Sequence, residues 1–218
     1  MAITEVKHKS LCHTTTSELS LAGYDLFSND LDTAARGTII YSKLNISCKH
    51  LHNQLSTHAF LCVEIKCEKQ KLLLATFYRS LTSSSSNDHA INRLITEYCE
   101  KYNGYILILG DFNYGDIVWS TGESRVSGSG DLFLKMLQDN LLTQHVTNPT
   151  RARGKDRPSV FDLVIANDDF VDDIVYLSPL GKNDHTVLEI HCNLWAQNKK
   201  RELNTIMAEG TMTSSASN

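Results

Sequence analysis

The sequence predicts a layered domain of class α/β or α+β. Seven segments of strand length are rich in apolar, β-branched or aromatic residues. These segments are 37–43, 60–66, 71–79, 104–109, 160–166, 173–177 and 187–192. Two helical patterns lie among them, and a series of strands interrupted by a few helices is typical of sheets covered by helices.

Both predicted helices carry an apolar stripe at helical spacing. The first stripe consists of Ile91, Leu94, Ile95, Tyr98 and Tyr102. We expect this helix to begin at a cap formed by Ser86 or Asn87 and to lie on a sheet. The second helix is expected over 131–140, where the stripe consists of Phe133, Leu134, Leu137 and Leu141. The Ser-rich segment 80–88 and the Gly- and Ser-rich segment 122–130 are predicted to be surface loops.

Composition indicates one globular domain. Its 218 residues allow a substantial core, and we expect the domain to span 1–195, followed by a disordered polar tail over 196–218. No apolar run reaches membrane-spanning length and the first residues do not form a secretion signal, which favours an intracellular protein of the nucleus or cytoplasm with no membrane partner. The six cysteines are scattered without a Cys-x-x-Cys pair, so we expect buried thiols.

The net charge of −4 argues against a protein that holds nucleic acid mainly through a broad basic surface. It does not exclude a nuclease, because an acidic centre can meet phosphate through Mg²⁺. One basic cluster is present, formed by Arg151, Arg153, Lys155 and Arg157. Such a cluster is by itself more often a solvated loop than a binding site.

Two short motifs carry candidate chemistry at the ends of predicted strands. Gly110-Asp111-Phe112-Asn113 follows an apolar strand, and Asn183-Asp184-His185 precedes another. Acids and amides are natural ligands of a hard divalent ion, which makes Asp111, Asp184 and Glu5 candidates. A lone motif of either kind has a structural alternative, since Asp and Asn favour turns and most Asp-His pairs lie on the surface.

The two motifs occur in order with further matches, and together they resemble the endonuclease/exonuclease/phosphatase superfamily. More narrowly, the chain resembles the apurinic/apyrimidinic-like endonuclease domain of non-long-terminal-repeat (LINE-type) retrotransposons. The resemblance runs from Ile3 to about Leu194. Besides the two motifs it includes 3–5, 36–41, 77–79, 149–151 and 161–163, together with the Asp-Ile-Val-Trp element at 116–119.

The resemblance implies an α/β sandwich of two packed mixed β-sheets flanked by helices. It also implies a metal site in which Glu5 binds Mg²⁺ or Mn²⁺ and Asp184 contributes to the metal site or its water shell. His185 is expected to contact the scissile phosphate, with Asp162 orienting its imidazole. Asp111 is expected to orient or deprotonate the attacking water.

Five further residues are implied as contacts to the substrate. Asn113 is expected to donate to phosphoryl oxygens and Tyr78 to hydrogen-bond the phosphate, both within the catalytic group. Arg79, Thr150 and Arg151 are the expected substrate-binding residues.

The sequence also departs from the family pattern. Relatives open with a strand that carries an active-site Asn, and that first strand is expected to be missing here, which would weaken activity. A full-length relative would continue into a reverse transcriptase domain, which this sequence lacks. Asn183 stands where the family usually has Ser, and an amide can still form the turn hydrogen bonds.

Three functions follow as hypotheses. The first is a Mg²⁺-dependent endonuclease that nicks DNA at the target site of retrotransposition, with DNA as the partner. The second is a phosphatase or phosphodiesterase of the same superfamily, acting on inositol phosphates or phospholipids. The third is a catalytically inactive, retrotransposon-derived relic or weak DNA binder.

Overall fold

A six-stranded mixed sheet is the centre of the computed structural model, which describes residues 1–6, 15–29, 31, 36–51, 60–68, 70–151, 158–181 and 183–194. Its strands, in spatial order, are β10 (Thr143–Gln144), β11 (Asp162–Ala166), β7 (Tyr105–Asp111), β6 (Gln70–Tyr78), β5 (Phe60–Cys67) and β4 (Cys48–His50). β6 and β7 are parallel, and the other neighbouring pairs are antiparallel. The parallel pair is joined through helix α1 (Ser85–Lys101), as a parallel connection requires.

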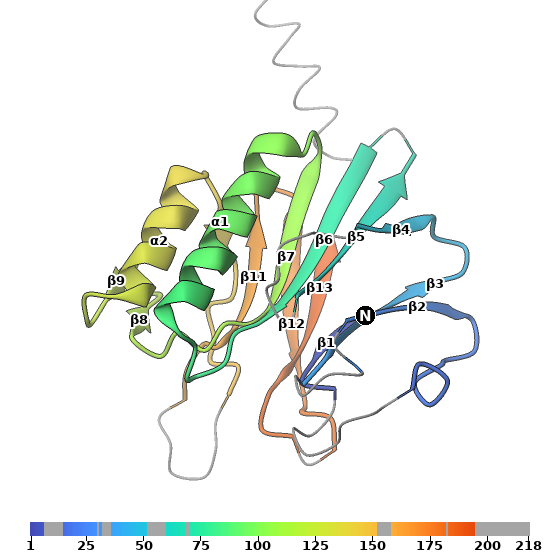
Figure 1. Ribbon diagram of the computed structural model, residues 1–218, viewed down its shortest axis with the longest axis horizontal. Coiled ribbons are helices and arrows are strands. Elements are labelled where there is room, and N and C mark those ends of the chain that lie inside the picture. Colours follow the sequence, from blue (N-terminus) through green and yellow to red (C-terminus); the bar gives the residue numbers. More distant parts are fainter. Residues whose placement is uncertain are drawn as a thin grey trace, which may run out of the picture.

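Two helices cover one face of this sheet (Figure 1). α1 and α2 (Ser129–Asp139) lie side by side, and their apolar stripes meet alternate residues of the central strands. On β6 these residues are Leu73, Ala75 and Phe77, which belong to the same buried cluster as Ile91 and Phe133 of the helices. Side chains alternate between faces along a strand, so this cluster uses every second residue.

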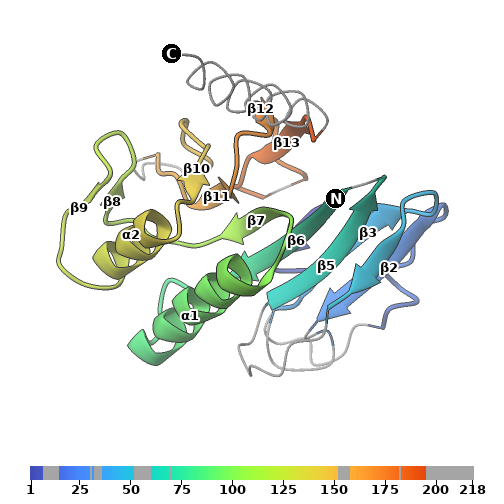
Figure 2. The same ribbon diagram turned by 90° about the horizontal axis from the view of Figure 1, so that it is seen from above.

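The residues of the six-stranded sheet that alternate with this cluster point to the opposite face, where they meet a second layer. It contains an antiparallel sheet in the order β1 (Ala2–Thr4), β3 (Thr38–Lys43), β2 (Tyr24–Asn29), and a hairpin of β12 (Val171–Leu177) and β13 (Val187–Cys192). Ile40 of β3 packs on Leu61 and Val63 of β5, whereas the hairpin packs on Leu72 and Leu107. Figure 2 shows β2 and β3 across the six-stranded sheet from α1.

The predicted α/β sandwich is therefore confirmed. All seven predicted strands are present, with ends within two residues of those expected. Not predicted were β1, β2, β4, β10 and the small hairpin of β8 (Ile117–Val118) and β9 (Glu123–Ser124). Within the described residues β1 pairs with β3 alone, so it is an edge strand.

Both helix starts differ from the sequence prediction. α1 begins at Ser85 and is capped by Ser84, whose side chain accepts a hydrogen bond from the N–H of Asn87. The segment 80–88 is thus only partly a loop, and Asp88 at its end is buried rather than on the surface. α2 begins at Ser129, inside the second predicted loop.

The prediction of buried cysteines was wrong for most of the thiols described. Cys62 is buried, Cys192 is exposed, and Cys48, Cys67 and Cys99 are intermediate. Cys12 and the predicted tail at 196–218 lie outside the described residues. No helix among the described residues combines the length and apolarity that crossing a membrane requires.

Candidate active site

Three neighbouring strands bring polar side chains to one edge of the six-stranded sheet. Tyr78 ends β6, Asp111 ends β7, and Asp162 begins β11. The register pairs Asp111 with Tyr78 on one side and with Asp162 on the other. Directly paired residues have their side chains on the same face of a sheet. The sheet itself therefore sets the spacing of these three groups.

Gly110 is required where β7 lies against the backbone of Phe77 in β6. Its φ is +146°, and a Cβ at this position would lie 1.9 Å from the carbonyl oxygen of Phe77. Beyond Asp111 the chain turns sharply, with Asn113 at φ +51°, in the left-handed region that Asn tolerates. The Asn113 amide donates to the Arg79 carbonyl oxygen at 2.9 Å, and the Arg79 N–H donates to the Asp111 carbonyl oxygen at 2.8 Å.

His185 reaches this edge from the loop that precedes β13. Its Nδ1 lies 2.8 Å from Oδ2 of Asp162. An isolated bridge with Arg151 and a 2.7 Å hydrogen bond from Thr186 N–H to the Thr150 carbonyl hold the loop. Thr150 is fully buried.

The Thr150 hydroxyl has a defined structural task. It accepts hydrogen bonds from the N–H groups of Phe161 and Asp162, at 3.1 and 3.0 Å. These are the residues that lead into β11 and carry the carboxylate opposite His185. Thr150 thus fixes the Asp162 backbone.

The two expected metal ligands each face an arginine. Asp184 Oδ2 lies 2.9 Å from Nε of Arg151, and Glu5 is ion-paired with Arg36. Both carboxylates are between a quarter and a third exposed, at 28% for Asp184 and 30% for Glu5. They are therefore accessible to a ligand from solvent, unlike the buried Asp111.

Burial and neighbouring groups shift the pKa values of four side chains in the site. Burial and then the charge of Asp162 raise the pKa of Asp111. Burial alone would lower the pKa of His185, but the hydrogen bond and charge of Asp162 outweigh it, so this pKa is raised. Burial also opposes ionisation of Asp184, yet Arg151 lowers the pKa of that carboxyl. Burial and then hydrogen bonding with Glu5 raise the pKa of Tyr78.

The oxygen donors fit a hydrated divalent ion better than a closed metal cage. Among the described residues, no group of three His, Cys, Asp or Glu side chains converges as a complete ligand set. Mg²⁺ commonly takes one or two carboxylates and keeps several waters. Glu5 and Asp184 supply that number, and the buried Oδ1 atoms of Asp111 and Asn113 lack a protein hydrogen-bond partner.

All ten predicted site residues lie in the described part of the chain and form one connected group. Their assigned roles stay predictions. Two partners were not predicted from the sequence: Arg36, which pairs with Glu5, and Asp88, which pairs with Arg79. The rest of the basic cluster, positions 153, 155 and 157, lies outside the described residues.

The Asp-Ile-Val-Trp element has a structural place beside the site. Asp116 accepts a 2.8 Å hydrogen bond from Ser124, and a Cβ at Gly130 would lie 2.4 Å from its Oδ2. The Asp116 carboxylate therefore lies at the first turn of α2, where negative charge is favourable.

Comparisons with known proteins identify the family and the fold of the chain. A family model described as endonuclease-reverse transcriptase matches residues 72–189, just over half of the chain. The endonuclease domain of TRAS1, a telomere-specific non-LTR retrotransposon, superposes with a TM-score of 0.62 at 18% identity, covering 80% of this chain and 82% of that one. No functionally curated protein matches the sequence.

Two other solved structures share the fold. An AP endonuclease from Archaeoglobus fulgidus has a TM-score of 0.55 at 11% identity, over 79% of this chain and 80% of that chain. The 3′ phosphatase NExo from Neisseria, bound to a product DNA hairpin, has a TM-score of 0.56 at 11% identity, over 78% and 80%. The sequence match and the shared fold together place the chain in the endonuclease-reverse transcriptase family of the endonuclease/exonuclease/phosphatase superfamily.

Proposed function

We propose that the chain is a divalent-metal-dependent endonuclease that nicks DNA, the target-site reaction of a retrotransposon. One observation carries the proposal. Asp111 lies between Tyr78 and the Asp162–His185 pair at a single sheet edge, with its pKa raised from 3.8 toward neutrality. A buried carboxylate of this kind suits proton transfer from water at physiological pH.

The residues divide the task of phosphodiester hydrolysis. Asp111 accepts the proton of the attacking water through its unpartnered oxygen. The hydrogen bond and charge of Asp162 raise the pKa of His185 and so favour its protonated form, which donates to a phosphoryl oxygen and stabilises the developing negative charge. Tyr78 remains a neutral hydroxyl, because its pKa is raised, and donates a hydrogen bond to the phosphate.

The metal would bind the partly exposed carboxylates, and the substrate would bind the arginines that pair with them. Glu5 and Asp184 would hold Mg²⁺ or Mn²⁺, which supplies Lewis-acid stabilisation of phosphoryl and leaving oxygens when bound. Arg151 and Arg36 then have their guanidinium groups available for substrate phosphates. DNA is the preferred substrate because membership of the endonuclease-reverse transcriptase family favours it over the phosphates of lipids or inositol.

The test is nicking of supercoiled plasmid by the purified chain in Mg²⁺ or in EDTA. Asp184→Ala should abolish nicking, whereas Asp173→Asn, an exposed acid at the far end of β12, should leave it unchanged. Nicking that requires neither metal nor Asp184 would contradict the proposal. A folded chain that releases phosphate from inositol phosphates instead would support the phosphatase, and one without either activity the relic.

A further inference from the structure

We propose that Arg79 and Asp88 form a buried positioning pair that fixes the segment 111–114, in place of the substrate contact expected of Arg79. The proposal rests on the proposed function, since this segment carries Asp111 and Asn113. Neither residue of the pair would touch the substrate. They would act on catalysis by holding the shape of the turn.

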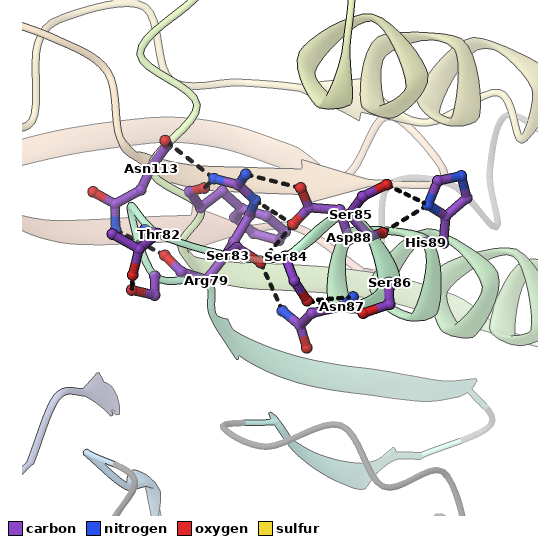
Figure 3. Close-up of polar contacts among 12 residues, drawn as sticks. Arg79, Thr82, Ser83, Ser84, Ser85, Ser86, Asn87, Asp88, His89 and Asn113 are labelled. Atoms are coloured by element: carbon purple, nitrogen blue, oxygen red, sulfur yellow. Dashed lines mark hydrogen bonds and ion pairs between the residues drawn. The ribbon is translucent and has the colours of Figure 1, made fainter.

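The pair itself is closed to solvent. The Arg79 guanidinium donates from Nε to Asp88 Oδ1 at 2.7 Å and from Nη2 to Oδ2 at 2.9 Å. Arg79 is 7% exposed and Asp88 is 3% exposed. This two-point geometry is the strongest arrangement of an arginine and a carboxylate. Figure 3 shows Arg79 pointing at the start of α1, where Asp88 lies.

The other side of the guanidinium holds the catalytic turn. Nη1 donates to the carbonyl oxygens of Phe112 and Asn113, at 3.2 and 3.3 Å. The guanidinium carbon lies 4.1 Å from the centre of the Tyr114 ring, a cation-π contact. The Arg79 main chain binds the same turn through Asp111 and the Asn113 amide. Arg79 therefore contacts all four residues of the segment.

The segment requires such support. Asn113 has a positive φ, a conformation that Asn tolerates but that the surrounding contacts still have to hold in place. Arg79 supplies those contacts, and Asp88 compensates the charge that would otherwise be buried without a partner. Loss of Asp88 should therefore release the guanidinium from the turn.

The Ser-rich segment before α1 completes the arrangement. Ser83 donates to Asp88 Oδ1 at 2.6 Å and accepts from the Asn87 amide at 2.9 Å, as Figure 3 shows. Asp88 also stands in the first turn of α1, where a carboxylate is favoured by the helix dipole. Burial alone would raise the pKa of Asp88, yet its hydrogen bonds, led by that of Arg79, lower it.

Arg151 provides the contrast within the same site. It is paired through Nε with a carboxylate that is 28% exposed, and its own side chain is 21% exposed. Arg79 and Asp88 are 8% and 4% exposed by the same measure of side chains. A phosphate can reach Arg151, whereas reaching Arg79 would require the turn to unfold.

The experiment compares hydrogen exchange over 111–114 with steady-state nicking kinetics in the wild type, Asp88→Asn, Arg79→Lys and Ser83→Ala. Glu97→Gln is the matched control, because it breaks only exposed ion pairs of the same helix. We expect Asp88→Asn and Arg79→Lys to speed exchange in this segment by at least about tenfold. We also expect kcat per folded molecule to fall by about 10–100-fold with KM within about twofold.

Ser83→Ala should change both readouts in the same direction but less, and it keeps the test decisive if Asp88→Asn does not fold. Unchanged exchange in the variants that fold would overturn the proposal. An Arg79→Lys variant would also overturn the proposal if it kept a normal kcat but had a raised KM and a salt dependence of binding whose slope corresponds to about one phosphate contact fewer. If the wild type does not nick DNA, the exchange comparison still decides the positioning role, whereas the proposed function alone has failed.

Discussion

Replacing Asp111 by Asn should stabilise the folded chain at neutral and alkaline pH, although it removes the proposed general base. Asp111 is 3% exposed, and burial and the charge of Asp162 raise its pKa from 3.8 to about 7. The ionised form is therefore disfavoured in the folded state. Asn keeps nearly the same shape without the charge.

The magnitude follows from linkage between protonation and folding. The folded-state pKa lies above the unfolded one, so the protonated carboxyl imposes no charge penalty below about pH 4. Stability is lost as pH rises from about 4 through 7 and stays low above that. Three pH units correspond to about 4 kcal/mol, which we take as the upper limit. We expect Asp111→Asn to gain about 2–4 kcal/mol at pH 8.

The assay is urea unfolding of both proteins between pH 4 and pH 8, in EDTA so that no metal binds the carboxylates. A chain of this size should also melt roughly 5–10 °C higher at pH 8 after the substitution. The difference between the two proteins should vanish near pH 4. Equal unfolding free energies at pH 8, or a difference that grows as pH falls, would refute the claim that the ionised carboxylate of Asp111 destabilises the folded state.

Three other substitutions test how the site is held together. Thr150→Val should lower the free energy of unfolding in urea by about 2–4 kcal/mol, because the N–H groups of Phe161 and Asp162 lose their acceptor. Thr150→Ser keeps a hydroxyl and should lower it by less than half as much. Equal losses in the two variants would contradict the role of this hydrogen bond. Gly110→Ala should prevent folding or lower the free energy of unfolding by more than about 4 kcal/mol, because its Cβ would overlap the Phe77 carbonyl. Gly122→Ala, at φ +69° with open space around it, should lower it by about 1 kcal/mol. Circular dichroism and urea unfolding measure both effects, and equal losses in the two variants would contradict the close contact at Gly110. Asp162→Asn should lower the pKa of His185, since the carboxylate raises it, and NMR titration of the imidazole that finds no change would show that the pair is not coupled.

Sequence patterns predicted the strands whose apolar runs are buried on both faces, such as β6 and β7. They missed β1 and β4, which have three residues each, and β2, in which polar residues interrupt the apolar ones. These strands are set by pairing with a neighbour rather than by their own composition, and local patterns carry little information about pairing partners.

The candidate site likewise contains some residues that local sequence patterns predict and others that they miss. Short motifs at strand ends predicted Asp111 and His185, because a turn that carries an acid or an imidazole next to an apolar run can be recognised from the local sequence. The ion pair of Arg79 with Asp88 could not be read in this way. A segment with four consecutive serines predicts a surface loop, yet here Ser84 caps α1 and Ser83 binds the buried Asp88.

Glu5 and Arg36 illustrate why electrostatic partners are hard to predict. They are separated by 31 positions in the chain and meet because β1 pairs with β3, which starts just after Arg36. No local sequence pattern around either residue predicts that it pairs with the other. Their pairing depends on the sheet register and thus on the folded structure.

The central claim is tested most directly by single-turnover cleavage of an end-labelled DNA duplex by the wild type, His185→Ala and Asp173→Asn. We predict Mg²⁺-dependent cleavage that leaves a 3′-hydroxyl, a loss of at least about 100-fold in His185→Ala at unchanged folded fraction, and no loss in Asp173→Asn. Cleavage that persists in EDTA, or that is equal in all three proteins, would contradict the account.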